Sequence, residues 1–257
     1  MIELKNIHKY YNPGSVNELC LFQNFSLEIP DGDFVAVVGS NGSGKTSLLN
    51  IICGTIPIDS GDIVVNGTSI VGKRDFLRHR GIGRVYQDPS KGTCPSMTIL
   101  ENLSLADNKG KPYNLGKGVN KAKIEQYKEL LKKLNLGLED KLYTQVGSLS
   151  GGQRQALALL MSTMTPIEFL ILDEHTAALD PKTADLIMEL TDQIVKEKKV
   201  TTIMVTHNLR YAVEYGNRLI MMHQGEAIID KSGEDKKALS TEDIMSTFNR
   251  ISVECGN

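Results

Sequence analysis

The chain has 257 residues, of which 40% are hydrophobic and 23% are charged, so it is long enough to bury a sizeable core. Lys and Arg total 29 and Asp and Glu total 31, and this near balance excludes a global field that would attract nucleic acid or an anionic membrane. No apolar run reaches the roughly 18–20 residues that a membrane-crossing helix needs, and the first residues show no secretory signal. We therefore expect a protein of the cytosol.

The N-terminal part of the chain predicts short antiparallel strands. Apolar and polar residues alternate in Ile2–Leu4 and in Phe25–Ile29, which is typical of half-buried strands. A further strand at Ile63–Val65 is followed by Asn66-Gly67, a dipeptide that favours a tight turn.

A glycine-rich turn follows the apolar stretch Phe34–Val38, which predicts a buried strand of a parallel sheet. The turn, GSNGSGKT, matches the pattern GxxxxGK[ST] and opens a helix, so backbone N–H groups and the helix N-terminus can hold phosphate. Lys45 adds a positive charge for the β- and γ-phosphates, and the Thr46 hydroxyl can ligate Mg²⁺. The predicted nucleotide contacts in this segment are Gly39, Ser40, Asn41, Gly42, Ser43, Gly44, Lys45, Thr46 and Ser47.

The segment from Asp88 to Gly147 lacks a convincing strand, and we expect an inserted helical lobe there. Its Lys- and Gly-rich part, Asn108–Lys123, runs into a predicted helix at Ala122–Leu134. Apolar residues recur in that helix at helical spacing, with lysines on the other face. We interpret the lysines as a solvated face rather than as a patch for lipid or nucleic acid.

A second anion site is predicted at LSGGQRQ, residues 149–155, where another helix begins. Hydroxyl and N–H groups at such a helix N-terminus can bind a phosphate oxygen. The residues expected to do so are Ser150, Gly151, Gly152 and Gln153.

The apolar strand Phe169–Leu172 ends in two adjacent carboxylates, Asp173 and Glu174. Placing two carboxylates at the end of a buried strand costs desolvation free energy, unless they bind a cation or take part in a reaction. We predict Asp173 as a ligand of the Mg²⁺ site and Glu174 as the base that polarises the attacking water. The alternative is an ordinary strand end that meets solvent.

These motifs, in this order, resemble those of the ATP-binding subunit of an ABC transporter, and the resemblance covers Ile2–Ile229. It implies the α/β fold of a P-loop nucleotide triphosphatase of ABC type. The expected parts are a mostly parallel core sheet flanked by helices, an N-terminal antiparallel β subdomain and an inserted α-helical subdomain. In a single domain over 1–257, the RecA-like core takes 1–87 and 148–230, and the helical subdomain takes 88–147. The short tail, 231–257, is expected to be a loop and a short helix.

The resemblance also assigns roles that the residues alone do not. Tyr11, in HKYYN, corresponds to the aromatic that stacks on adenine, with Tyr10 as the alternative register. Gln87, in VYQDP, corresponds to the glutamine that reaches toward Mg²⁺ and the water, and His207 to the histidine that contacts the γ-phosphate. The implied catalytic residues are Lys45, Gln87, Glu174 and His207, and the implied metal ligands are Thr46, Gln87 and Asp173.

In this family the helix that begins after Ser150 meets the γ-phosphate held by a second subunit. The resemblance therefore implies a head-to-tail homodimer with ATP at its interface, crossed by Ala178-Leu179-Asp180. One position departs from the family: His175 stands where a proline usually follows the catalytic glutamate. Because proline fixes the backbone, its absence leaves the pose of Glu174 open.

The implied function is ATP hydrolysis coupled to transport through a separate integral membrane permease, at the cytoplasmic face of the cell membrane and without a nucleic-acid partner. The phrase LDEHTAALDPKTA resembles ATPases of bacterial solute-uptake systems. This favours an importer of an amino acid or a related small solute, with an extracellular solute-binding protein as a further partner. The alternatives are a simple exporter ATPase, a soluble ABC ATPase such as one in iron–sulfur cluster assembly, and a regulatory module that binds ATP without cleaving it.

Overall fold

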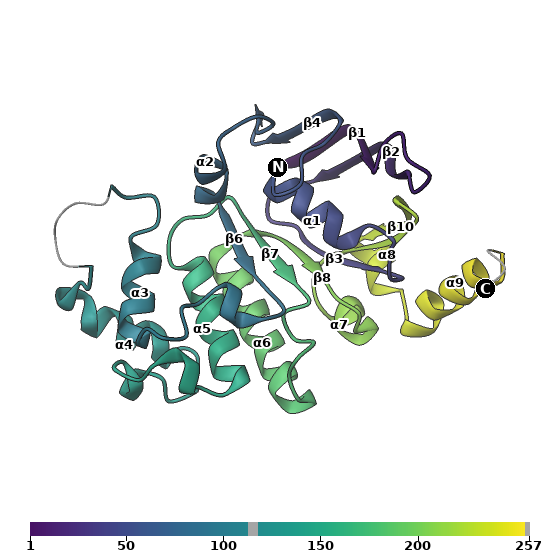
Figure 1. Ribbon diagram of the computed structural model, residues 1–257. Helices are drawn as coiled ribbons and strands as arrows, with labels where there is room; N and C mark the ends of the chain where they lie inside the picture. The colour runs from purple at the N-terminus through teal and green to yellow at the C-terminus, as the bar shows by residue number, and fades with distance from the viewer. Residues whose placement is uncertain (113–117, 255–257) are drawn as a thin grey trace. The chain divides into compact units, whose positions relative to one another are not determined.

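The computed structural model describes residues 1–112 and 118–254, with residues 252–254 described by their backbone alone. The chain forms two compact units, one made of Met1–His79 and Lys199–Asn257 and the other of Arg80–Lys198 (Figure 1). The predicted Lys- and Gly-rich segment and the end of the predicted tail lie partly outside the described residues. The predicted subdomain bounds at 87/88 and 147/148 stay a prediction.

An antiparallel sheet opens the first unit, in the order β2-β1-β4-β5. Its strands are β1 (Ile2–Tyr11), β2 (Leu19–Ile29), β4 (Ser60–Val65) and β5 (Thr68–Ser69). The alternating apolar residues of β1 and β2 are buried, as the pattern predicts. Asn66 and Gly67 have φ of 49° and 74°, so the predicted tight turn joins β4 to β5.

Parallel strands form the other sheet of this unit. β3 (Phe34–Gly39) pairs in parallel with β8 (Thr201–Val205) and with β9 (Arg218–His223), and β10 (Glu226–Ser232) is antiparallel to β9. Every residue of β3 is buried, which agrees with its apolar sequence. The predicted strand at Phe34–Val38 is therefore present, whereas β9 and β10 were not predicted. Helices of the same part of the chain include α1 (Lys45–Cys53), α2 (Asp75–Arg80) and α7 (Leu209–Glu214).

The C-terminal tail differs from its prediction. The tail was expected to be a loop followed by a short helix, but β10 extends to Ser232 and two helices follow, α8 (Gly233–Lys237) and α9 (Thr241–Glu254). Lys236, only 3% exposed, donates hydrogen bonds from Nζ to the carbonyls of Val213 and Tyr215 at the C-terminal end of α7. Lys236 is thus a buried residue that caps the C-terminal end of α7, where a cation is favoured.

The second unit combines a parallel strand pair with several helices. β6 (Ile82–Val85) pairs with β7 (Phe169–Asp173), with Val85 opposite Leu172. The longer helices are α3 (Ile99–Asp107), α4 (Ile124–Lys132), α5 (Gly151–Thr163) and α6 (Pro181–Lys198). Four short 3-10 turns lie at Pro89–Lys91, Lys121–Lys123, Glu139–Lys141 and Val146–Ser148.

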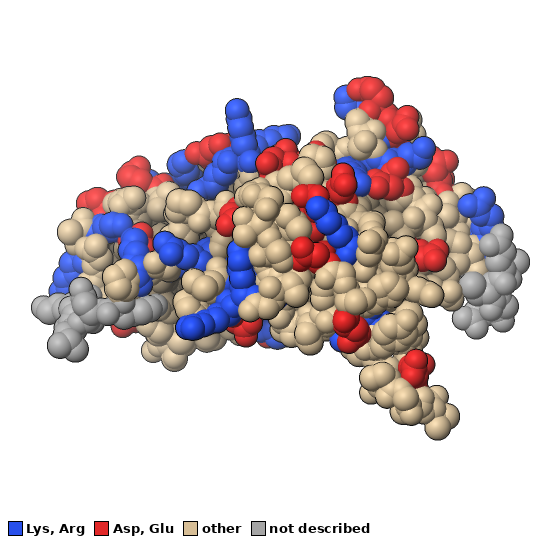
Figure 2. Space-filling model, turned by 90° about the horizontal axis from the view of Figure 1, so that it is seen from above, with Lys and Arg blue, Asp and Glu red and all other residues tan. Residues whose placement is uncertain are grey.

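Residues 88–147 contain helices and no named strand in their described part, in agreement with the expected helical lobe. The predicted helix Ala122–Leu134 is α4 with a preceding 3-10 turn, and it buries Tyr127 and Leu131. Its lysines form exposed ion pairs with glutamates three residues earlier, such as Lys132 Nζ with Glu129 Oε1 at 2.6 Å. Acidic and basic side chains also lie interspersed on the face shown in Figure 2. No helix in the described residues is long and apolar enough to span a membrane.

Candidate functional site

The phosphate loop leads from β3 into α1 in the first unit. Gly44, the N-cap of α1, has φ of 102° and provides no side-chain cap. The backbone angle favours glycine, and a Cβ at this position would also press on the Phe22 ring at 3.1 Å. The first turn of α1 therefore presents its backbone N–H groups without a capping side chain, as an anion-binding helix start requires.

Lys45 is buried and turned back along the loop. Its Nζ donates to the carbonyl oxygens of Gly39 and Ser40 at 2.8 Å each, and lies 3.5 Å from Ser43 Oγ. These bonds hold the ammonium group within the glycine turn, where a phosphate would need its charge.

Tyr11 lies beside the loop at the end of β1. Its hydroxyl is 3.2 Å from Ser47 Oγ on α1, and Lys9 Nζ lies 5.5 Å from its ring centroid. The structure thus places the predicted adenine-stacking tyrosine next to a predicted phosphate-loop residue. Tyr10 pairs with Cys20 across β1 and β2 instead.

His207 follows β8, the parallel neighbour of β3. Val37 of β3 lies opposite Val205 of β8, and the Thr206 N–H donates to the Val37 carbonyl at 3.2 Å. Since both strands end here, the exposed His207 and the phosphate loop share one sheet edge. The next residue, Asn208, caps α7 through its Oδ1, which fixes the chain just after the histidine.

In the second unit, Asp173 ends β7 and accepts an ion-pair hydrogen bond. Arg84 Nη2 on β6 lies 2.8 Å from Asp173 Oδ2, and both side chains are largely buried. The Arg84 guanidinium carbon also lies 4.6 Å from the Tyr86 ring centroid. One carboxylate oxygen of the predicted metal ligand is therefore held in place by a positive charge.

Glu174 follows in a left-handed backbone conformation, with φ of 49°. A non-glycine residue in this region costs about 1–2 kcal/mol and persists only where the surroundings impose it. The Glu174 carbonyl accepts from the Ala177 N–H at 3.0 Å, which closes a turn. His175, 2% exposed, lies inside this turn, and burial lowers its pKa from 6.5 to about 4.

Gln87 is exposed and lies two residues beyond β6, at the strand-pair edge where Asp173 ends β7. Its neighbour Tyr86 is tied to α5, because the buried Gln155 donates from Nε2 to the Tyr86 carbonyl at 2.9 Å. The LSGGQRQ motif thus supports the backbone that carries Gln87.

The helix α5 begins with a capping box. Ser150 Oγ accepts from the Gln153 N–H at 3.2 Å, and Gln153 Oε1 accepts from the Ser150 N–H at 3.3 Å. Gly152 packs against Thr183, where an added Cβ would lie 2.3 Å from the threonine methyl. The Ser150 oxygen therefore accepts a bond within the helix while its hydroxyl remains able to donate to a phosphate.

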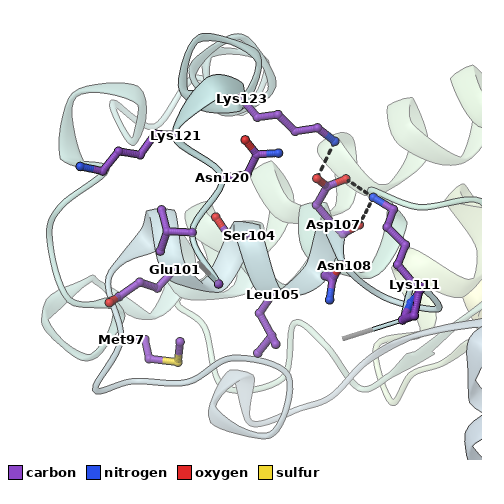
Figure 3. A pocket seen from close by; sticks show the side chains of 13 residues that line it. Met97, Glu101, Ser104, Leu105, Asp107, Asn108, Lys111, Asn120, Lys121 and Lys123 are labelled. Atoms are coloured by element: carbon purple, nitrogen blue, oxygen red, sulfur yellow. Dashed lines mark hydrogen bonds and ion pairs between the residues drawn. The ribbon is translucent and has the colours of Figure 1, made fainter. Parts of the chain in front are cut away.

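A separate hollow of about 890 Å³ lies in the second unit along α3 and the segment around Asn120 (Figure 3). Lys123 Nζ lies 2.6 Å from Asp107 Oδ2, and Lys111 Nζ lies 3.3 Å from Asp107 Oδ1. Burial alone would raise the pKa of Asp107, but hydrogen bonds from Lys123, Tyr127 and Lys111 outweigh it and lower the pKa below its ordinary value. None of the predicted nucleotide contacts lines this hollow.

The predicted Mg²⁺ ligands supply a hydroxyl, an amide and a carboxylate, which are the hard oxygen donors that Mg²⁺ prefers. Among the described residues, no group of three His, Cys, Asp or Glu side chains gathers as a metal site. Such a donor set fits Mg²⁺, because this ion commonly uses one or two protein carboxylates and takes its remaining ligands from phosphate and water.

The predicted residues are divided between the two units. Tyr11, the phosphate loop and His207 belong to the first unit. Gln87, Ser150, Asp173 and Glu174 belong to the second. Local sequence patterns assign no role to Arg84, because its contact with Asp173 depends on the pairing of two strands that are distant in the sequence. Gln155, in contrast, lies within the recognised LSGGQRQ motif. The glycine turn between a buried parallel strand and a helix, with its inward lysine, defines a P-loop nucleotide-binding protein.

Comparisons with known proteins agree with that class and narrow it. The family model described as "ABC transporter" matches residues 22–177. The chain is 50% identical over 250 residues to the "Tyrosine transport ATP-binding protein" of Clostridioides difficile (strain R20291), covering 96% of this chain and 98% of that protein. It is 33% identical over 243 residues to a "Phosphonates import ATP-binding protein PhnC" of Lactobacillus delbrueckii subsp. bulgaricus, covering 91% of each.

Among solved structures, a dimeric post-hydrolysis state of an ATP-binding cassette bound to ADP and Pi matches with a TM-score of 0.75 and 30% identity. The match covers 90% of this chain and 98% of that chain. The chain belongs to the ABC transporter family and is an ATP-binding, ATP-hydrolysing subunit of it. The family, the α/β fold and the ATPase activity predicted from the motifs are thereby confirmed, whereas the roles of single residues stay predictions.

Proposed function

We propose that this chain powers the uptake of an amino acid, tyrosine or a related aromatic solute, through a separate membrane permease. The observation that carries this proposal is the 50% identity over nearly full length to a tyrosine transport ATP-binding protein. Phosphonate and xylose/arabinose import proteins are also similar, at 31–33% identity, which supports import as the direction. An extracellular solute-binding protein would deliver the solute, and the chain would act at the cytoplasmic face of the membrane.

The working unit in this proposal is a head-to-tail pair of chains. Tyr11 stacks on adenine, and the N–H groups of the glycine turn with Lys45 hold the β- and γ-phosphates. Ser150 of the second copy, at the start of its α5, donates its hydroxyl to the γ-phosphate. The dimeric cassette structure bound to ADP and Pi supports such an arrangement.

In the reaction, Glu174 accepts a proton from the attacking water, and His207 contacts the γ-phosphate. Thr46, Gln87 and Asp173 would hold Mg²⁺, which supplies charge neutralisation to the phosphates. Loss of the γ-phosphate removes the group that joins the two copies, so they separate and the motion passes to the permease.

Glu174→Gln tests the catalytic assignment. The variant keeps the size of the side chain but removes its basicity, so we expect at least a roughly 100-fold loss of phosphate release together with retained ATP binding. We also expect a stable ATP-bound dimer by size-exclusion chromatography. Wild-type turnover in this variant, or a monomer under saturating ATP and Mg²⁺, would exclude the proposed mechanism.

The transport assignment is tested with the chain and its co-purified permease in proteoliposomes. ATP-dependent uptake of labelled tyrosine is expected, with Lys45→Ala as the inactive control. ATP-dependent efflux would indicate an exporter. Recovery of the chain only in a cytosolic complex without a multi-span membrane protein would instead favour a soluble ATPase.

A further inference from the structure

The turn that carries Glu174 is held by a buried polar contact. His175 Nε2 lies 3.1 Å from Thr191 Oγ1 on α6, and neither side chain reaches solvent to any extent. The contact spans 16 residues of sequence, and it joins the end of β7 to the third turn of an 18-residue helix.

The direction of this hydrogen bond follows from its neighbours. Thr191 Oγ1 lies 2.7 Å from the Ile187 carbonyl, which can only accept, so the threonine hydroxyl donates there. Its oxygen is then left as the acceptor for the imidazole, and His175 carries its proton on Nε2. The ring is therefore held in one orientation by a chain of bonds that ends on the backbone of α6.

The same turn has a backbone that needs such support. Glu174 is left-handed, with φ of 49°, and its carbonyl accepts from the Ala177 N–H at 3.0 Å. His175 and Thr176, the two residues inside this turn, are both buried. A fixed ring at position 175 thus limits how the peptide between residues 174 and 175 can rotate, and that peptide sets where the Glu174 side chain points.

We propose that His175 is a positioning residue for Glu174, acting through its hydrogen bond to Thr191. In relatives a proline at this position would restrict the backbone after the glutamate. In this chain the hydrogen bond between His175 and Thr191 provides the restriction, and it keeps the Glu174 carboxylate directed at the reacting water. The proposal rests on the proposed role of Glu174 as the base.

The test compares Thr191→Val with Thr191→Ser. Valine keeps the shape of threonine but removes the acceptor oxygen, whereas serine keeps the hydroxyl. We expect Thr191→Val to lower kcat for ATP hydrolysis roughly tenfold, because small displacements of a catalytic group have large effects on rate, with KM for ATP changed less than about twofold. Thr191→Ser should retain kcat close to that of the wild type.

Two variants at position 175 complete the test. His175→Gln offers an N–H donor at a similar distance and should retain more activity than His175→Leu, which offers none. The double variant His175→Leu with Thr191→Val should be no slower than His175→Leu alone, because both changes break one interaction. Binding of a fluorescent ATP analogue and thermal unfolding, measured on every variant, separate positioning from loss of the fold.

Each outcome decides the proposal. If Thr191→Val keeps the wild-type kcat, or if its loss appears in KM or in nucleotide binding instead, His175 does not position the base. Additive effects in the double variant would overturn it as well. Glu174→Gln is measured alongside: if that variant turns over ATP normally, the proposed function itself fails, whereas an inactive Glu174→Gln with an active Thr191→Val refutes only the role of His175.

Discussion

Two helices of this protein are predicted to meet phosphate, and they begin in different ways. α1 starts at Gly44, which supplies no side-chain cap, and the inward Lys45 is bonded to the loop carbonyls. α5 starts at Ser150, whose side chain and Gln153 form a complete capping box. The start of α1 thus lacks a side-chain cap, as a phosphate-binding helix start requires, whereas the start of α5 is capped by its own side chains. We infer from this difference that the start of α1 binds the nucleotide, whereas the capped start of α5 contacts the nucleotide that a second copy holds.

The largest effect expected from this comparison is that of Lys45→Ala. Loss of the ammonium removes charge stabilisation of the phosphates, so ATPase activity should fall at least roughly 100-fold. Phosphate release and ATP titration measure the change. Lys128→Ala removes an exposed lysine that is paired with Glu125 on α4 and serves as the control, which should keep full activity. Activity within threefold of the wild type in Lys45→Ala would contradict the gripping role.

A comparison of Gly44→Ala with Gly67→Ala separates the strain of a left-handed backbone from the steric contact with Phe22 at the glycine turn. Gly44 and Gly67 both have positive φ, 102° and 74°, but an added Cβ meets Phe22 only at Gly44 and nothing within 4 Å at Gly67. Each alanine variant should lose about 1 kcal/mol of unfolding free energy for the left-handed backbone. Gly44→Ala should lose more and should also weaken ATP binding. Equal losses in urea unfolding, with unchanged ATP affinity, would show that the loop tolerates a side chain.

A third prediction concerns Ser150. The helix α3 begins with a capping box of the same kind, formed by Thr98 and Glu101, so Thr98→Ala is a matched control for Ser150→Ala. Both variants should lose about 1 kcal/mol of stability, the usual effect of removing an N-cap. Only Ser150→Ala should also slow ATP turnover, because only Ser150 is proposed to meet the γ-phosphate. Equal ATP turnover in the two variants would show that Ser150 only caps the helix and does not contact the γ-phosphate.

The smallest expected effect is a difference in pH dependence between these two boxes. The bonds from the Thr98 N–H and hydroxyl lower the pKa of Glu101 below 4.5. A carboxyl with a lowered folded pKa stabilises the fold above its unfolded value and loses that contribution as pH falls through the folded pKa. Gln153 in the α5 box does not titrate. Glu101→Gln should therefore flatten the acid part of the stability curve, and an unchanged curve by urea unfolding at several pH values would contradict this.

Site residues that belong to a motif of consecutive residues could be predicted from the sequence. Residues whose role depends on contacts between distant elements could not. The phosphate loop and the LSGGQRQ helix start depend on consecutive residues, and each stands where its motif predicts. The ion pair between Arg84 and Asp173 depends instead on the alignment of β6 with β7, which no local pattern contains.

The first strand gives a second example of this limit. The choice between Tyr10 and Tyr11 could not be made from alternation, because β1 has irregular register with β2 between Lys9 and Tyr10. The tail gives another example: no local pattern distinguishes Lys236 from its neighbouring lysines, because its partners are carbonyls at the end of α7. In both cases the deciding partner lies on another element of the chain.

That lysine has a practical consequence for editing the gene. Its ammonium group joins α8 to the last carbonyls of α7 by hydrogen bonds. The first residue of α7 lies two positions after His207. In a truncated variant that lacks α8, the carbonyls of Val213 and Tyr215 would be hydrated instead of bonded to Lys236. We expect the C-terminal end of α7 to unwind in that variant. Deletion of α8 should therefore disturb the position of His207, the predicted contact of the γ-phosphate, whereas an affinity tag placed after α9 should leave the hydrogen bonds of Lys236 intact.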